Sequence, residues 1–133
     1  MSNEPAALFI GRWSPFHNGH DHIIRKALDA GHPVVVAIRD TPLSEHAPYS
    51  VAERREMIEN TYVDEDVTVI LIPDICSVNI GRKVGYEINR YAVPLDIAGI
   101  SATDIRTAIA AGDDSWKNNV PEAVAKCLDK GGE

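Results

Sequence analysis

Two kinds of apolar pattern alternate along the chain, and together they predict an alternation of strands and helices. Three short segments are almost continuously apolar, which is typical of strands buried on both faces of a parallel sheet. These segments are residues 6–13, 33–39 and 67–73. Apolar residues at helical spacing predict helices over residues 19–31, 50–62, 101–112 and 121–130.

The ends of the predicted helices carry local signals of their own. Ser50 precedes the second helix and Glu53 stands three residues later, which is the spacing of a capping box. Ser101 and Asp104 repeat this spacing before the third helix. The natural C-terminal stops are the glycines at Gly31 and Gly112.

Alternating strands and helices imply right-handed crossovers and an α/β fold, a Rossmann-like doubly wound parallel sheet. A length of 133 residues fits a single domain over residues 1–133, with a core of about 7–128. Two weaker patterns predict a helix over 81–91 and a fourth strand over 94–100. In such folds a ligand lies beyond the carboxyl ends of the strands.

Composition excludes several classes of partner. The formal net charge of −7 argues against broad contact with nucleic acid, because that contact needs many Lys and Arg residues. No apolar run reaches the roughly 18 residues of a membrane span. The first residues lack the pattern of a signal peptide, so we expect a cytoplasmic protein without a membrane partner. The only two cysteines, Cys76 and Cys127, are expected to be thiols.

The stretch "FIGRWSPFHNGHDHII", residues 9–24, joins a predicted strand to a predicted helix and holds three of the five histidines. A turn that opens a helix offers free backbone N–H groups and the positive end of the helix dipole, which together favour a phosphate. Glycines would let a ligand approach the backbone closely, and cationic or imidazole side chains would add donors. The candidate contacts are Gly11, Arg12, His17, Gly19 and His20.

Two other interpretations of this stretch stay open at this point. The turn could be an ordinary one whose histidines are solvated. His17, His20 and His22 could also bind a metal, but a helix starting at residue 19 would point His20 and His22 to different faces. We also expect no Cys or carboxylate to complete such a set.

A second stretch, residues 101–106, also opens a predicted helix. Its simplest interpretation is a helix cap. Thr103 and Arg106 are three residues apart, however, so a hydroxyl and a guanidinium would be neighbours on the first helical turn. With the free backbone N–H groups there, they could hold a second phosphate.

These two stretches carry a resemblance to the nucleotidylyltransferase superfamily. "GRWSPFHNGH" resembles the H-x-G-H signature of that superfamily, and "ISATDIR" resembles its second signature, I-S-x-T-x-x-R. "YSVAERREMI", residues 49–58, is similar to a further segment of the family. The matching positions are His17, Gly19 and His20 in the first signature and Ser101, Thr103 and Arg106 in the second.

The resemblance implies an enzyme that transfers a nucleoside monophosphate from an NTP to a phosphate-bearing small molecule and releases pyrophosphate. It implies that His17 and His20 stabilise the reacting α-phosphate. Ser101, Thr103 and Arg106 would hold the outer phosphates, and Arg106 would take part in catalysis. Mg²⁺ would be held by the nucleotide phosphates rather than by protein ligands.

Within the superfamily, "GRWSPFHNGH" and the tail "GDDSWKNNVPEAV" resemble small nicotinamide mononucleotide adenylyltransferases, which favours ATP and AMP transfer. The short chain instead resembles glycerol-3-phosphate cytidylyltransferases, which use CTP. A non-catalytic nucleotide-binding regulatory module on the same fold is the alternative from another class. A homo-oligomer would be common for this family.

Other residues are candidates for contacts with the acceptor molecule and with the base of the nucleotide. Many relatives carry a Lys shortly before the "YS" segment, where this chain offers His46, or Arg39 in its place. Trp13 and Tyr86 could stack on a base or belong to the core. The candidate acceptor contacts are Arg39, Arg82, Lys83 and Arg90.

Overall fold

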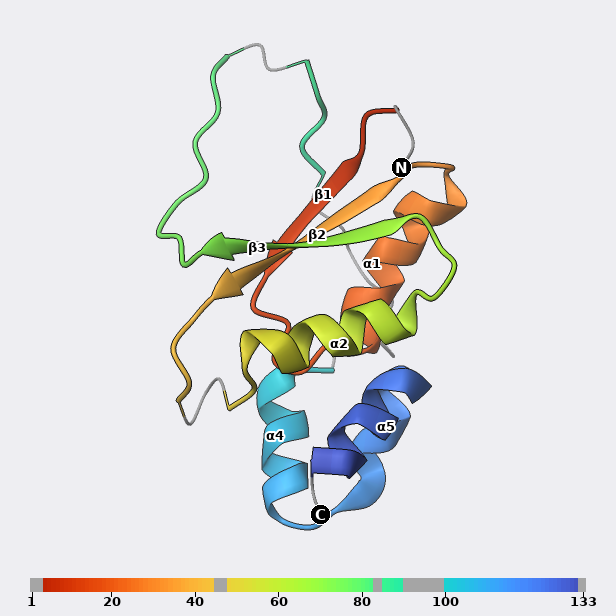
Figure 1. The fold of residues 1–133 in the computed structure, drawn as a ribbon, viewed down its shortest axis with the longest axis vertical. Coiled ribbons are helices and arrows are strands. Elements are labelled where there is room, and N and C mark those ends of the chain that lie inside the picture. Colours follow the sequence, from red (N-terminus) through yellow and green to blue (C-terminus); the bar gives the residue numbers. More distant parts are fainter. Residues whose placement is uncertain (1–3, 45–47, 83–84, 90–99, 132–133) are drawn as a thin grey trace.

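The computed structural model describes residues 4–44, 48–82, 85–89 and 100–131. Its strands form one parallel sheet in the order β1-β2-β3 (Figure 1). The strands are β1 (Ala7–Gly11), β2 (Val34–Asp40) and β3 (Val67–Pro73). The helices are α1 (Asn18–Asp29), α2 (Val51–Thr61), α4 (Ala102–Ala110), the 3-10 helix η1 (Asp114–Asn119) and α5 (Glu122–Gly131). The predicted Rossmann-like α/β fold with a parallel sheet is confirmed.

One face of the sheet carries the core. Phe9, Val36 and Val69 lie side by side across the three strands and are buried. They share a single cluster with Ile24 of α1 and Met57 of α2, because each of these helices turns an apolar face toward the sheet. On the opposite face, apolar side chains stay more exposed: Leu8 at 57%, Ile10 at 36% and Ile70 at 39%.

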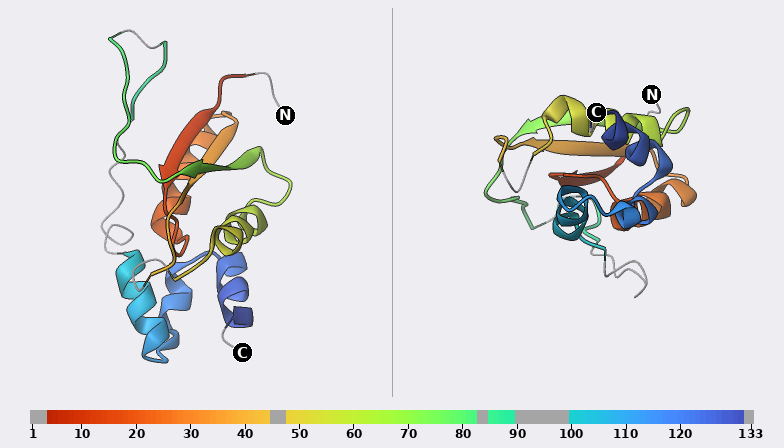
Figure 2. Two further views of the ribbon diagram at one scale, coloured as in Figure 1. Left: turned by 60° about the vertical axis from the view of Figure 1, so that its left-hand side comes forward. Right: turned by 90° about the horizontal axis from the view of Figure 1, so that it is seen from below.

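The C-terminal elements gather at the carboxyl end of the sheet. Figures 1 and 2 show α4, η1 and α5 together there, with α5 alongside α2 and the start of α4 beside the loop that follows β1. Gly31 and Gly112 follow α1 and α4 with positive φ, as their predicted stop positions require. None of the described helices is long and apolar enough to cross a membrane.

The predicted helix over 81–91 was wrong for the part of it that is described. Residues 81–82 and 85–89 adopt no helix, and their backbone includes a positive φ of 72° at Gly85. The apolar side chains there, Tyr86 at 60% exposed and Ile88 at 55%, pack against no core that could stabilise a short helix. The predicted fourth strand falls outside the described residues except for Ile100, which is not in a strand. The helix η1 was not predicted.

A buried arginine joins the strands to α2. Arg54 is completely buried, and its Nη1 donates to the carbonyl oxygens of Arg12 and Arg39, both at 2.9 Å. Its Nε donates to the carbonyl of Ser50 at 3.3 Å. The side chain thus ties the ends of β1 and β2 to the start of α2. Burial lowers the pKa of Arg54, and the charge of Asp40 opposes that shift.

We expect Arg54→Met to lower the free energy of unfolding by about 2–4 kcal/mol, because the carbonyl of Arg12 would lose its donor and the carbonyls of Arg39 and Ser50 would each keep only a backbone N–H. Urea denaturation measures the change. Arg55→Met is the matched control, since Arg55 is exposed on the same helix and only pairs with Glu59 at 3.4 Å. Equal losses in the two variants would contradict the structural role of Arg54.

Candidate active site

The loop between β1 and α1 is shaped around one aromatic ring. Trp13 has a left-handed backbone, with φ of 56°, and its indole folds back over the end of β1. A Cβ at Gly11 would lie 2.9 Å from two carbons of that ring, so only glycine fits there. The indole Nε1 donates to the carbonyl of Ala37 at 3.0 Å. This packing fixes the path of the loop as it approaches α1.

The two motif histidines cap α1 for each other. His17 is the N-cap, and its Nδ1 accepts a hydrogen bond from the backbone N–H of Gly19 at 3.1 Å. His20 returns the bond, because its Nδ1 accepts from the backbone N–H of His17 at 3.2 Å. The two rings stack with 3.6 Å between centroids. This is a capping box in which imidazoles replace the usual Ser or Thr and Glu.

This arrangement assigns the protons of both imidazoles. A nitrogen that accepts a hydrogen bond carries no proton, so each neutral ring is protonated at Nε2. Each Nε2–H therefore points away from the bonded backbone, and neither is used in a hydrogen bond to another described residue. Burial lowers the pKa of His17 to about 4. Burial, with the nearby His17, also lowers the pKa of His20 well below its usual value. Both histidines are thus neutral donors at pH 7.

The second motif reaches directly into this loop. Arg106 on α4 donates from Nη1 to the carbonyl of Ser14 at 2.6 Å and from Nη2 to the Thr103 hydroxyl at 3.2 Å. Ser101 is the N-cap of α4, and its Oγ accepts from the N–H of Asp104 at 3.1 Å. The predicted neighbours Thr103 and Arg106 are therefore together. The bond from Arg106 to Ser14 brings α4 against the loop that precedes α1.

Further groups complete the surroundings. The charge of Arg106 lowers the pKa of Tyr49, but burial is the larger effect, and the pKa is raised overall. Tyr49 and the buried Arg54 were not predicted as site residues. The only sequence signal for them was their place in the "YSVAERREMI" segment. The side chain of Arg12 is exposed at the end of β1.

Three of the expected contacts already have partners within the protein. Trp13 is only 5% exposed, so its indole belongs to the core and has no free face on which a base could stack. The N–H of Gly19 is already bonded to His17, which leaves it unavailable to a phosphate. Arg39 pairs with Asp74 at 2.7 Å and also donates to the carbonyl of Ile75, so its guanidinium is engaged at the ends of β2 and β3.

Of the remaining candidates, the structure describes Arg82 and Tyr86. Arg82 and Tyr86 are exposed in the long segment after β3, which projects from the body of the molecule (Figure 1). Lys83, Arg90 and His46 lie outside the described residues. Within the described ranges, no group of three or more His, Cys, Asp or Glu side chains is placed to hold a metal ion.

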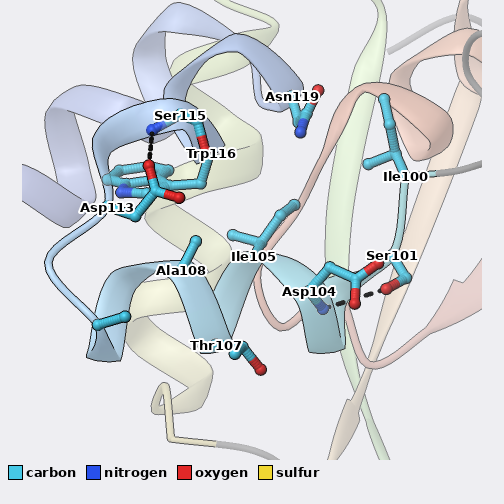
Figure 3. A pocket seen from close by; sticks show the side chains of 11 residues that line it. Ile100, Ser101, Asp104, Ile105, Thr107, Ala108, Asp113, Ser115, Trp116 and Asn119 are labelled. Carbon is cyan, nitrogen blue, oxygen red and sulfur yellow. Dashed lines mark hydrogen bonds between the residues drawn. The ribbon is translucent and has the colours of Figure 1, made fainter.

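Two open hollows border the site. One, of about 380 Å³, lies between α4 and η1, with Ile105 and Trp116 in its lining and the carboxylates of Asp104 and Asp113 beside them (Figure 3). The other, of about 400 Å³, is lined by the start of α1 and the end of η1. Both include Ile100 and Asn119, and neither is lined by the motif histidines or Arg106.

Comparison with known proteins agrees with this geometry. A family model described as cytidylyltransferase-like matches residues 8–124. The chain belongs to this family. It is accordingly a nucleotidylyltransferase, the class of enzyme that its two signatures indicated.

Several proteins that are similar to this chain over nearly its whole length are named nicotinamide-nucleotide adenylyltransferases. The protein from Picrophilus torridus is 26% identical, covering 93% of this chain and 90% of the relative. The protein from Ignicoccus hospitalis is 29% identical, covering 92% and 90%. A crystal structure of a bifunctional NMN adenylyltransferase/ADP ribose pyrophosphatase from Francisella tularensis shares the fold, with a TM-score of 0.60 and 21% identity. The match covers 92% of this chain and about half (49%) of that longer one.

The depressed pKa of His17 makes folding depend on pH. The unfolded chain binds a proton near pH 6.5 and the folded one only near pH 4, so stability is full above pH 6.5 and falls as the pH drops. Between pH 7 and pH 5 the loss attributable to His17 is about 2 kcal/mol. Urea denaturation of His17→Asn, which keeps a good N-cap, should show that much less dependence on pH. An unchanged pH dependence would show that His17 does not carry the effect.

Proposed function

We propose that this nucleotidylyltransferase transfers AMP from ATP to a phosphate-bearing small molecule and releases pyrophosphate. The observation that carries the proposal is the reciprocal cap of His17 and His20, which leaves two neutral N–H donors beside the loop that Arg106 contacts. The names of the relatives favour ATP as the donor and nicotinamide mononucleotide as the first acceptor to test. A homo-oligomer remains a prediction.

In the proposed reaction an oxygen of the acceptor phosphate attacks the α-phosphorus of ATP, and the bond from that phosphorus to the bridging oxygen breaks. The acceptor phosphate is already a nucleophile, so the protein needs no general base. The Nε2–H groups of His17 and His20 would donate to the α-phosphate oxygens, whose negative charge changes most along the reaction. Fixed donors of this kind need no rearrangement during the transfer.

The outer phosphates would be held at the start of α4. Arg106 keeps unused N–H donors beyond its bonds to Ser14 and Thr103, and the N-terminus of α4 supplies backbone N–H groups. Arg12 is the exposed cation nearest in sequence to the same loop. These residues would neutralise pyrophosphate as it leaves.

Mg²⁺ suits such a site as a companion of the nucleotide. The donors of the site are imidazole, guanidinium and backbone N–H groups, which bind phosphate oxygens rather than a hard cation. We therefore propose that the nucleotide phosphates hold Mg²⁺, where it would offset their negative charge.

The function is tested by measuring pyrophosphate release with Mg²⁺ for ATP with nicotinamide mononucleotide and for CTP with glycerol 3-phosphate. We expect product with ATP and a dinucleotide in the mass spectrum. Product from CTP alone would replace the proposal with the cytidylyl alternative. Nucleotide binding by thermal shift without product from any acceptor in a panel of phosphorylated metabolites would indicate a regulatory module instead.

Changing His20 should separate catalysis from capping. His20→Ala removes the donor to the α-phosphate and should lower kcat by about 10²–10³-fold. His20→Glu restores an acceptor for the N–H of His17, as in an ordinary capping box, so it should recover stability but not activity. Steady-state kinetics and urea denaturation measure both quantities. Recovery of activity in the Glu variant would mean that His20 acts only as a cap.

Arg106→Ala should mainly weaken the binding of ATP, because the lost guanidinium contacts the outer phosphates. One charge-assisted hydrogen bond is worth about 1.5–3 kcal/mol, which corresponds to roughly a 10- to 150-fold rise in Kd. Calorimetric titration of ATP with Mg²⁺ measures this. Lys126→Ala is a control, since Lys126 is exposed on α5 and pairs with Glu122. An unchanged Kd in Arg106→Ala would remove it from the phosphate site.

A further inference from the structure

Several aromatic contacts converge on the ring of His20. The indole of Trp13 meets it at 87° with 4.7 Å between centroids, and the ring of Phe16 lies 5.5 Å away. His17 stacks on it at 3.6 Å. Trp13 and Phe16 are themselves buried, at 5% and 0% exposed. The imidazole of His20 is therefore enclosed by rings that have little freedom to move.

Trp13 is the most firmly held of these rings. Its Nε1 is tied to the carbonyl of Ala37 in the middle strand at 3.0 Å, 24 residues away in sequence. Its backbone has the left-handed φ of 56°, which costs energy for a bulky residue and persists only where the surroundings compensate it. Gly11 provides the space that the ring occupies. The left-handed backbone of Trp13, the absence of a side chain at Gly11 and the hydrogen bond to Ala37 together hold the indole in place.

We infer that Trp13 is a positioning residue: it holds the imidazole of His20 in the orientation in which Nδ1 accepts from His17 and the Nε2 proton faces the substrate. A rotated ring would lose the bond from the His17 N–H, and the proton could then lie on either nitrogen. Only the fraction of molecules with the proton on an outward Nε2 could donate to the α-phosphate. The expected effect on catalysis rests on the proposed function, whereas the inferred orientation and tautomer of His20 do not.

The direct readout is the ¹⁵N NMR spectrum of the imidazoles without nucleotide, with the His20 signals assigned from the His20→Ala spectrum. In the natural protein we expect His20 to show one neutral tautomer, protonated at Nε2, from pH 5.5 to pH 8. Trp13→Leu should give a mixture of tautomers and a His20 titration that moves up toward pH 6.5. Trp13→Phe keeps a ring but loses the tie to Ala37, and should show a smaller change in the same direction.

Trp116→Leu is the matched control. Trp116 is also 5% exposed and buried in the same core, but it lies beside the hollow between α4 and η1 and has no ring contact with His20. Its loss should lower stability while leaving the tautomer of His20 unchanged. If Trp13→Leu does not fold, the His20 tautomer in Trp13→Phe is compared with that in Trp116→Phe, and only the Trp13 variant should show a change.

Kinetics supply the second readout. Trp13→Leu should lower kcat by about 10- to 100-fold while the KM for ATP changes less than about twofold, because the misplaced group acts in the transition state. Folded Trp13 variants with the natural His20 tautomer and titration would overturn the inference. If the spectra change as expected but no acceptor supports turnover, the inference about His20 stands and the proposed function fails.

Discussion

The site depends on the reciprocal cap between His17 and His20. A helix start leaves backbone N–H groups without partners, and proteins usually satisfy them with hydroxyl and carboxylate side chains. In this chain two imidazoles do so, and each uses Nδ1 for the purpose. The cap therefore determines both the start of α1 and the position of the Nε2 protons. Structure and chemistry are set by the same two hydrogen bonds.

Around this cap, the buried groups are arranged to keep the loop before α1 in one conformation. Arg54 donates hydrogen bonds to the carbonyls at the ends of β1 and β2, and the Trp13 ring packs against Gly11. A guanidinium buried among carbonyls is costly in a fold of this size. The bonds from Arg54 to the carbonyls of Arg12, Arg39 and Ser50 offset this cost and set the spacing of the two strand ends.

Much of the fold follows from sequence pattern, because the three buried strands and the capped helices satisfy local rules. β3 covers the predicted residues 67–73, and Ser50 caps α2 as expected. The pattern failed at the described residues 81–82 and 85–89, where local spacing suggested a helix but the apolar side chains Tyr86 and Ile88 are exposed. For the site, spacing predicted that Thr103 and Arg106 are neighbours, as they are, while the roles of His17 and His20 came from the family resemblance. Spacing could not show that Trp13 is buried or that Arg39 is paired with Asp74, because both depend on contacts between strands.

The bond from Arg106 to Ser14 joins residues 92 positions apart. Closing so long a segment has an entropic cost that is met only when the intervening sheet and helices have formed. The two halves of the site can therefore be joined only in the folded chain. A fragment that retained both histidines but lacked α4 would lose the bond from Arg106 to the loop before them, and so the site needs segments from both ends of the sequence.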